Sequence, residues 1–390
     1  MPLANSLPDA DSLSHPEARY PLDLAFCTHC SLVQITETVP PEKLFREYLY
    51  FSSYSDTMLE HARRLVEMLI SSRNLGARHL VVELASNDGY LLQYYRKAGI
   101  PVLGIEPAEN VARVAREERG IATLTEFFGR ELADRLRAEG SQADVVHAHN
   151  VLAHVADLPG FVAGIRTLLA PDGVAVLEVP YVKDLVDRCA FDTIYHEHLC
   201  YFSLTALQSL FDRNGLEVRG VERITIHGGS LRLFVGHPGS PPAASEEVRS
   251  MLDDEAGRGM GRPEYYEAFS RRVEALKGEL LAFLGALKAG GKRLAGYGAA
   301  AKGAVLLNYI GIGRDLLEFV VDRNDHKQGR YMPGVHLPIR PPEYLLEAMP
   351  DYVLLLAWNL ADEIIAQQSE YRRRGGRFVV PVPEPRVLES

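Results

Sequence analysis

The sequence predicts an α/β protein with three domains. Strand-like apolar segments alternate with amphipathic helical segments after residue 57. Two separate stretches each begin with a strand that runs into a glycine-containing turn, and 390 residues are too many for one ordinary core. We place the domain boundaries at residues 1–68, 69–238 and 239–390.

The composition excludes several classes of protein. The hydrophobic fraction is 47% and the charged fraction 24%, which is typical of globular chains. The net charge is −10 without a block of Lys and Arg, so neither nucleic acid nor an anionic membrane is expected as a partner. The start lacks the apolar segment of a signal peptide, and no apolar run reaches the roughly 20 residues of a membrane span. We expect a soluble, cytoplasmic protein of unknown oligomeric state.

The N-terminal segment contains a pair of cysteines. Residues 1–20 are polar and proline-bearing, and we expect them to be loosely held. Cys27 and Cys30 follow, between two short strand-like pieces. They supply two of the four ligands of a zinc site, and Cys189 and Cys200 lie far along the chain. The pair is either half of a metal site or a tight turn with two reduced thiols.

An aromatic stretch around Tyr48 and Tyr50 follows, and then a helical pattern over residues 57–73. The aromatic and hydroxyl groups fit two roles. They pack the small domain against its neighbour, or they form a lid over a substrate.

The first α/β unit follows the rule that a parallel sheet binds ligands at the carboxyl ends of its strands. Its expected strands are residues 79–84, 101–106, 143–148 and 173–179. Its expected helices begin near residue 91, cover residues 108–117, and include residues 161–168.

The turn after the first of these strands predicts an adenosyl site. The strand ends at Glu83, the turn contains Ala85, Asn87, Asp88 and Gly89, and the next strand ends at Glu106 about 20 residues on. A carboxylate there is suited to both ribose hydroxyls, and Gly89 lets the backbone approach a ligand. Acidic groups repel pyrophosphate but suit a sulfonium and an ammonium, which favours S-adenosylmethionine over NAD. The other interpretation is a purely structural turn.

Two further residues follow the third strand. Asn150 and His154 stand where a transfer chamber is expected at the strand ends. His154 either faces that site or is a histidine at a helix start bonded to the backbone.

The second α/β unit begins after a break and a linker. Gly228 and Gly229 interrupt the strand-like run 221–234, residues 238–264 are expected to be a linker, and a long helix is expected over residues 264–288. The turn Gly296-Tyr297-Gly298 and the cation Lys302 then favour a bound phosphate, with Asp322 available to a ribose. A nucleoside diphosphate fits as well as NAD, and an inert copy of the fold is the alternative. Strands are expected at residues 293–295, 317–322 and 352–358.

The segment Tyr195-His196-Glu197-His198-Leu199 groups a phenol, two imidazoles and a carboxylate just after the first unit. We interpret it as a centre of proton chemistry between the two binding units, with His196 directed away from His198. A zinc site or a structural cluster is the alternative. Two imidazoles and a carboxylate on adjacent residues do not easily converge on one ion.

Six motifs occur in an order that resembles a known family. They are Glu83-Leu-Ala-Ser-Asn-Asp-Gly, Glu106-Pro107, Asn150-Val-Leu-Ala-His154, the segment 195–199, His227-Gly-Gly-Ser-Leu-Arg232 and Gly296-Tyr-Gly-Ala-Ala-Ala-Lys302-Gly. Together they resemble the three-domain S-adenosylmethionine-dependent sugar C-methyltransferases, which act on dTDP-linked 4-keto-deoxysugars of branched antibiotic sugars, typically at C3. The resemblance covers nearly the whole chain.

The resemblance implies a fold and a set of site residues. The fold is a small N-terminal domain related to a zinc-binding domain, a class I methyltransferase-like central domain and a Rossmann-like C-terminal domain. His198 is then the base, beside Tyr195 and Glu197. The implied cofactor residues are Glu83, Ala85, Asn87, Asp88, Gly89, Glu106, Pro107, Asn150 and His154, and the implied residues for the nucleotide-linked sugar are Tyr48, Tyr50, His227, Gly228, Gly229, Arg232, Gly298 and Lys302.

The proposed chemistry also follows from the residue types. Carbon methylation requires a proton to be removed next to a carbonyl, and an imidazole has a suitable pKa. Tyr195 is placed to donate to the enolate oxygen, and Glu197 to orient an imidazole.

The chain departs from the family in two places. It has only the second Cys-x-x-Cys pair, Cys27 and Cys30, so a bound zinc is in doubt, and Ala85 replaces a common glycine. Rival functions are an O- or N-methyltransferase of another natural product, an NAD-dependent oxidoreductase, and a non-enzymatic nucleotide sensor.

Overall fold

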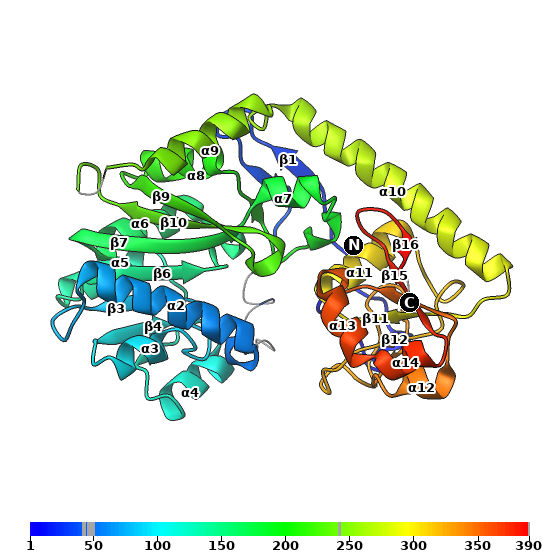
Figure 1. Ribbon diagram of the computed structural model, residues 1–390. Coiled ribbons are helices and arrows are strands. Elements are labelled where there is room, and N and C mark those ends of the chain that lie inside the picture. Colours follow the sequence, from blue (N-terminus) through cyan, green and yellow to red (C-terminus); the bar gives the residue numbers. More distant parts are fainter. Residues whose placement is uncertain (41–43, 45–50, 241–242, 389–390) are drawn as a thin grey trace.

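The structure is a computed structural model that describes residues 1–40, 44, 51–240 and 243–388, with the backbone but not the side chain of His227. Two α/β domains lie side by side, connected by the long helix α10 (Pro263–Ala289), and both chain ends lie near the C-terminal domain (Figure 1). Tyr48 and Tyr50 are outside the described residues. No helix among the described residues is both long and apolar enough to cross a membrane.

The central domain is built on a seven-stranded sheet in the order β5-β4-β3-β6-β7-β10-β9. Neighbouring strands are parallel from β5 to β7, whereas β10 is antiparallel to both β7 and β9. The strands are β3 (Val81–Leu84), β4 (Val102–Ile105), β5 (Thr123–Leu124), β6 (Ala143–His149), β7 (Leu169–Pro180), β9 (Glu217–Ile224) and β10 (Ser230–Gly236).

Helices cover both faces of this sheet because successive strand residues point to opposite sides. Val81 packs in the cluster formed with α2 and α3, whereas the next residue, Val82, packs in the larger cluster that contains α5 and α6. The helices are α2 (Asp56–Arg73), α3 (Leu92–Lys97), α4 (Glu109–Glu117), α5 (Arg130–Ala138), α6 (Leu158–Leu168), α7 (Val182–Asp187) and α8 (Leu204–Arg213). The alternation predicted from the sequence is confirmed, and the fold is α/β as expected.

Helix α2 has the local signals that start and stop a helix. The Ser55 hydroxyl accepts a hydrogen bond from the Met58 amide at 3.3 Å, which caps the first turn. Asn74 ends the helix in the left-handed conformation, with φ 51°. The buried side chains Met58, Ala62, Leu65, Val66 and Leu69 then form its inner face.

The C-terminal domain has a six-stranded sheet in the order β13-β12-β11-β14-β15-β16, parallel except for β16. Strand β12 is shorter than the predicted 317–322, and β14 ends at Leu355, before Trp358. The strands are β11 (Leu294–Tyr297), β12 (Val320–Val321), β13 (Ile339–Arg340), β14 (Tyr352–Leu355), β15 (Arg377–Val380) and β16 (Arg386–Val387); the helices are α11 (Ala301–Ile310), α12 (Tyr344–Ala348), α13 (Ala361–Gln367) and α14 (Ser369–Arg373).

The N-terminal sheet takes one strand from the central domain. Strand β2 (Val33–Ile35) pairs with β1 (Leu24–Phe26) on one side and with β8 (Cys200–Tyr201) on the other. Because β8 directly follows the segment 195–199, the small domain fixes one end of that segment.

The prediction that residues 1–20 are loosely held is wrong. The Tyr331 amide donates to the Pro8 carbonyl at 2.9 Å, and the Gly334 amide donates to the Glu17 carboxylate at 2.7 Å. The segment therefore bonds to the C-terminal domain, a contact that its polar composition does not reveal.

The linker predicted over residues 238–264 is also wrong in part, because it contains the helix α9 (Glu246–Gly257). Glu255 of this helix is fully buried and accepts hydrogen bonds from the Tyr181 hydroxyl at 2.8 Å and from the Leu204 amide at 2.7 Å. Helix α9 consequently packs on the central domain, beyond the boundary drawn at residue 238. The segment packs on the domain despite its polar composition, because the buried Glu255 carboxylate is fully provided with hydrogen-bond donors there.

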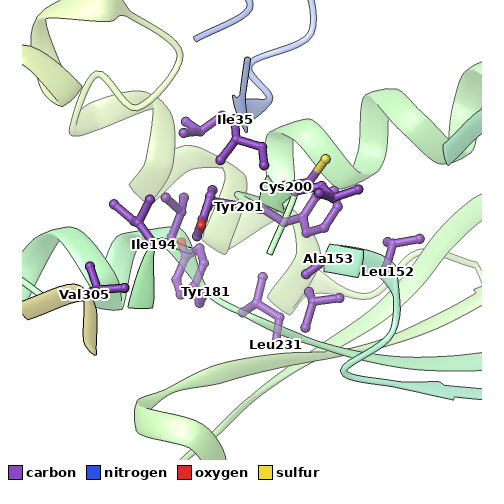
Figure 2. Close-up of a cluster of buried hydrophobic side chains, with 14 of the residues drawn as sticks. Ile35, Leu152, Ala153, Tyr181, Ile194, Cys200, Tyr201, Leu231 and Val305 are labelled. Atoms are coloured by element: carbon purple, nitrogen blue, oxygen red, sulfur yellow. The ribbon is translucent and has the colours of Figure 1, made fainter. Parts of the chain in front are cut away.

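A continuous apolar core joins the three parts of the chain. Ile35 of the N-terminal sheet, Leu231 of the central domain and Val305 of the C-terminal domain belong to one buried cluster. Figure 2 shows these side chains around Tyr181 and Tyr201. The domains are thus held by apolar burial next to the segment 195–199.

Candidate active site

A cavity of about 2240 Å³ extends from the central domain to the C-terminal domain. It lies where β3, β4, β6 and β7 end, as the rule for parallel sheets predicts. The residues expected in the site that line it are Ala85, Asn87, Glu106, Pro107, Asn150, His154, Tyr195, Glu197, His198, Gly228, Gly229, Arg232 and Lys302.

The cofactor loop is organised around Glu106. One carboxylate oxygen accepts from the Asn87 amide and the other from the Ala108 amide, each at 2.9 Å. Burial raises the pKa of Glu106 to about 7, against the lowering effect of these two amides. Ala85 has φ 50°, a conformation that favours glycine, which is the residue common in the resembled family.

The other expected cofactor residues occupy different positions. Glu83, Asp88 and Gly89 do not line the cavity. Burial, and then the neighbouring Asp88 and Glu106, raise the pKa of Glu83 well above its usual value. Gly89 has φ 75°, and a Cβ there would come within 2.5 Å of Ile121 Cδ1, so packing of the loop accounts for the glycine.

These residues fit an adenosyl cofactor. Glu106 lies at the cavity wall with acceptor capacity beyond its two amide bonds, and Asn150 has a buried side-chain oxygen without a hydrogen-bond partner among the described residues. The loop therefore fits S-adenosylmethionine, as predicted.

The Tyr195 hydroxyl lies 3.0 Å from His198 Nε2. On the other side of the ring, Nδ1 lies 3.0 Å from the Thr193 carbonyl oxygen. A carbonyl only accepts, so Nδ1 carries the hydrogen and Nε2 is the basic nitrogen, which accepts from Tyr195. The orienting group is a backbone carbonyl, which leaves no mark in the sequence.

Glu197 and His154 flank this pair. The Glu197 side chain accepts from the Asn5 amide group at 2.7 Å, and burial raises its pKa. The His154 ring donates from Nδ1 to the Glu197 carbonyl at 2.5 Å and lies edge-on to the His198 ring, with 4.9 Å between centroids. His154 thus faces the cavity, and burial lowers its pKa.

His196 is directed away from His198, as predicted. Its Nε2 donates to the Pro21 carbonyl at 3.0 Å, and its ring meets Tyr20 edge-on. It joins the cluster to the N-terminal domain.

The glycine turn before β10 is shaped by the central domain. Gly229 has φ 118°, and a Cβ would come within 2.2 Å of Asp184 Oδ2, while Gly228 has φ 86°. The side chain of His227 is outside the described part of the structure. The Asp184 carboxylate in turn binds Arg223 at 2.5 Å.

Arg232 belongs to a buried charge network that the sequence did not reveal. Its Nε donates to Glu178 at 2.7 Å, and one terminal nitrogen donates to Glu222 at 2.9 Å. His61 and His149 also contact Glu178, at 2.9 and 3.1 Å. The network ties α2, β6, β7, β9 and β10 together, and all its members except Glu178 line the cavity. Its members come from five elements far apart in the sequence, so no local motif predicts it.

The second loop meets the central domain at Asp192. This carboxylate is completely buried, accepts from the Trp358 indole at 2.7 Å, and lies 3.8 Å from Lys302 Nζ. Lys302 also lies 3.9 Å from the centroid of the Trp358 ring and donates to Asn359. Desolvation lowers the pKa of Lys302, and Asp192 opposes that effect.

The glycines of this loop serve packing. Gly298 does not line the cavity; its φ is 102°, and a Cβ would be 2.8 Å from Ala357 Cβ. A Cβ on Gly303 would be 2.9 Å from the Gly298 carbonyl, so Gly303 brings α11 close to the loop and strand. Asp322 accepts from the Ala299 amide at 2.6 Å and thus fixes the turn.

The cysteine pair forms a turn between β1 and β2. The Cys27 carbonyl accepts from the Ser31 amide at 2.8 Å, with Ser31 at φ 59°. Within the described ranges, no group of three or more His, Cys, Asp or Glu side chains is positioned to hold a metal. Two thiols are only two of the four ligands that tetrahedral zinc requires, so the described residues around Cys27 and Cys30 do not fit a zinc ion.

Comparison with solved structures gives low overall similarity. Magnesium protoporphyrin IX methyltransferase from Synechocystis PCC 6803 is 16% identical with a TM-score of 0.35, over 45% of this chain and 78% of that chain. The PH0226 protein from Pyrococcus horikoshii is 14% identical with a TM-score of 0.39, over 50% of this chain and 98% of that chain.

Comparison with known sequences is more informative. Family models match a putative zinc binding domain at residues 1–45, a methyltransferase domain at 56–221 and a C-methyltransferase C-terminal domain at 225–383. Ubiquinone biosynthesis O-methyltransferase from Roseobacter denitrificans is 34% identical over 99 residues, which are 25% of this chain and 39% of that protein. C-methyltransferase NovU from Streptomyces niveus is 38% identical over 393 residues, covering 100% of this chain and 92% of NovU. This full-length similarity shows that the chain belongs to the C-methyltransferase family and is a methyltransferase.

Proposed function

We propose that this enzyme methylates a carbon next to the ketone of a dTDP-linked 4-keto-deoxysugar, with S-adenosylmethionine as methyl donor. The observation that carries the proposal is the Tyr195–His198 pair, 3.0 Å apart, in a cavity lined by the cofactor loop and by Lys302 of the C-terminal domain. Membership of the C-methyltransferase family supports carbon as the acceptor.

The chemistry starts at His198. Its Nε2 takes the proton from the carbon next to the ketone, and the electron pair of that C–H bond becomes the enolate. Because Nε2 then carries a hydrogen, the Tyr195 hydroxyl no longer donates to it and turns its own hydrogen toward the enolate oxygen. S-adenosylmethionine, when bound, would supply the electrophilic methyl group, to which the enolate carbon forms the new C–C bond while the S–CH3 bond breaks and S-adenosylhomocysteine leaves. The imidazolium afterwards returns its proton to water.

The remaining groups hold the pair in place. The Thr193 carbonyl fixes the His198 tautomer, and His154 packs on the ring. Glu106 is assigned to the ribose of the cofactor, and Asn87 and Asn150 to its neighbourhood. Lys302 and Trp358, on the opposite wall, are assigned to the sugar nucleotide.

The test is to incubate the protein with S-adenosylmethionine and a panel of dTDP-4-keto sugars and to read the product by mass. Wild-type enzyme is expected to add one methylene mass unit to a keto sugar. With S-adenosylhomocysteine in heavy water, it is expected to exchange the hydrogen next to the ketone. Methylation that requires no ketone and shows no such exchange would instead identify an O- or N-methyltransferase.

His198→Ala should lose both methyl transfer and exchange by at least about 100-fold while binding S-adenosylhomocysteine normally. His326→Ala, an exposed histidine of the C-terminal domain, is the matched control and should retain activity. If His198→Ala still exchanges the hydrogen, the base lies elsewhere.

A further inference from the structure

Among the described residues, five Lys and Arg side chains line the cavity, and their partners differ. Arg64 pairs with Glu60 at 2.5 Å, Arg223 with Asp184 at 2.5 Å, and Arg232 with Glu178 at 2.7 Å. Lys302 faces Asp192 and Asn359. The fifth, Arg188, has an exposed side chain that makes no hydrogen bond or ion pair within the described residues.

The backbone that carries Arg188 is held firmly. Two guanidinium nitrogens of Arg272, on α10, donate to the carbonyls of Val186 and Asp187 at 3.0 and 3.1 Å. The Arg188 amide donates to the Asp184 carbonyl at 3.1 Å. The backbone at this position is therefore fixed, and the guanidinium, which pairs with no described carboxylate, is available to an anion in the cavity.

Arg188 lies near the glycine turn of the central domain and close in the chain to the contact with the C-terminal domain. Its terminal nitrogen is the nearest atom to the place of a Cβ on Gly228, at 3.9 Å, so the guanidinium lies at the glycine turn. Four residues later in the chain, Asp192 bonds Trp358 and faces Lys302. Four residues span at most about 14 Å, so the backbone at Arg188 lies within that distance of the residue that faces Lys302, and both cations line the same cavity.

The charge balance explains why a second cation is needed there. The diphosphate of a nucleotide-linked sugar carries two negative charges. Lys302 alone does not balance them, because the buried Asp192 carboxylate, 3.8 Å away, already offsets its charge. An arginine presents a planar fork of donors that matches phosphate oxygens.

We propose that Arg188 binds the diphosphate of the nucleotide-linked sugar, opposite Lys302. This assignment rests on the proposed function and extends it by naming a residue that holds the substrate across the domain boundary. Arg188 takes no part in the proton transfer.

Calorimetric titrations of the full-length protein with S-adenosylhomocysteine, dTDP and thymidine test the proposal. Arg188→Gln should weaken dTDP binding by about tenfold or more and leave the affinities for thymidine and S-adenosylhomocysteine unchanged. Arg188→Lys should fall between, because it keeps the charge but loses the fork. Arg64→Gln, at a cavity cation on α2 that already pairs with Glu60, is the control and should bind dTDP like wild type.

The outcomes separate the two proposals. If wild type binds dTDP and Arg188→Gln binds it equally well, the assignment of Arg188 is wrong and the proposed function stands. A loss of S-adenosylhomocysteine affinity instead would place Arg188 at the cofactor carboxylate and also overturn the assignment. Wild-type protein that neither binds dTDP nor methylates any dTDP sugar would remove the proposed function and this assignment together.

Discussion

The indole nitrogen of Trp358 donates a 2.7 Å hydrogen bond to Asp192 across the boundary between the C-terminal and central domains. Asp192 stands one residue before Thr193, whose carbonyl fixes the tautomer of His198. The wall of the C-terminal domain and the proposed base are therefore linked through a few bonds of backbone.

Replacing Trp358 by Phe should lower the free energy of unfolding by about 1–3 kcal/mol. The change removes the donor to a carboxylate that is completely buried and already has one oxygen without a hydrogen-bond partner in the described structure. Urea unfolding followed by circular dichroism measures the effect.

Tyr309→Phe is the matched control for that measurement. It also removes one hydrogen bond, to Glu274, but this bond is solvent-exposed, so the expected loss is under about 1 kcal/mol. Equal losses in the two variants would contradict the importance of the buried bond.

Glu178 should be the most sensitive member of the charge network to substitution. Burial opposes its ionisation, but His149, His61 and Arg232 outweigh this and hold its pKa well below the usual value. Glu178→Gln leaves Arg232 poorly compensated in a buried place, which should cost about 3–5 kcal/mol of unfolding free energy. Chemical denaturation at pH 7 gives this value.

Glu222→Gln supplies the comparison, because its half-exposed carboxylate also pairs with Arg232 and should cost under about 1 kcal/mol. The sign of the pH dependence follows from the lowered pKa of Glu178. The contribution of Glu178 to the free energy of unfolding is present above the pKa that this carboxyl has in the unfolded chain. It is lost as the pH falls through the lower pKa of the folded protein. A Glu178→Gln protein as stable as Glu222→Gln would refute this account.

The affinity for S-adenosylhomocysteine should rise with pH around neutrality. Burial raises the pKa of Glu106 to about 7, and only its ionised form accepts from both ribose hydroxyls. Affinity should therefore increase about tenfold between pH 6 and pH 8, as measured by calorimetry. Glu106→Gln should bind more weakly and show little pH dependence; an unchanged slope in this variant would assign the titration to another group.

The raised pKa of Glu106 makes folding stability fall with rising pH, whereas the affinity for the cofactor rises. Folded protein holds this proton more tightly than the unfolded chain does. The contribution of Glu106 is thus fully present below the unfolded value and is lost as the pH rises toward about 7.

The sequence alone determined the elements with strong local patterns and the residue types of the site. Apolar periodicity predicted α2 and α10 to within two residues at each end, and strand–helix alternation predicted the parallel sheets, because helix and strand periods are local properties. The motif order predicted which residues meet at the strand ends: Glu106, Asn150, Tyr195 and His198 all line one cavity.

Only the tertiary structure decided what these residues touch. It directed the Glu197 side chain to Asn5, gave the orientation of His198 to the Thr193 carbonyl, and committed Arg232 to Glu178. It also made a buried helix of part of the expected linker and bonded the first twenty residues to the C-terminal domain. These contacts join groups far apart in the chain or use backbone atoms that every residue possesses. Their energies depend on burial, which no local pattern of residues specifies.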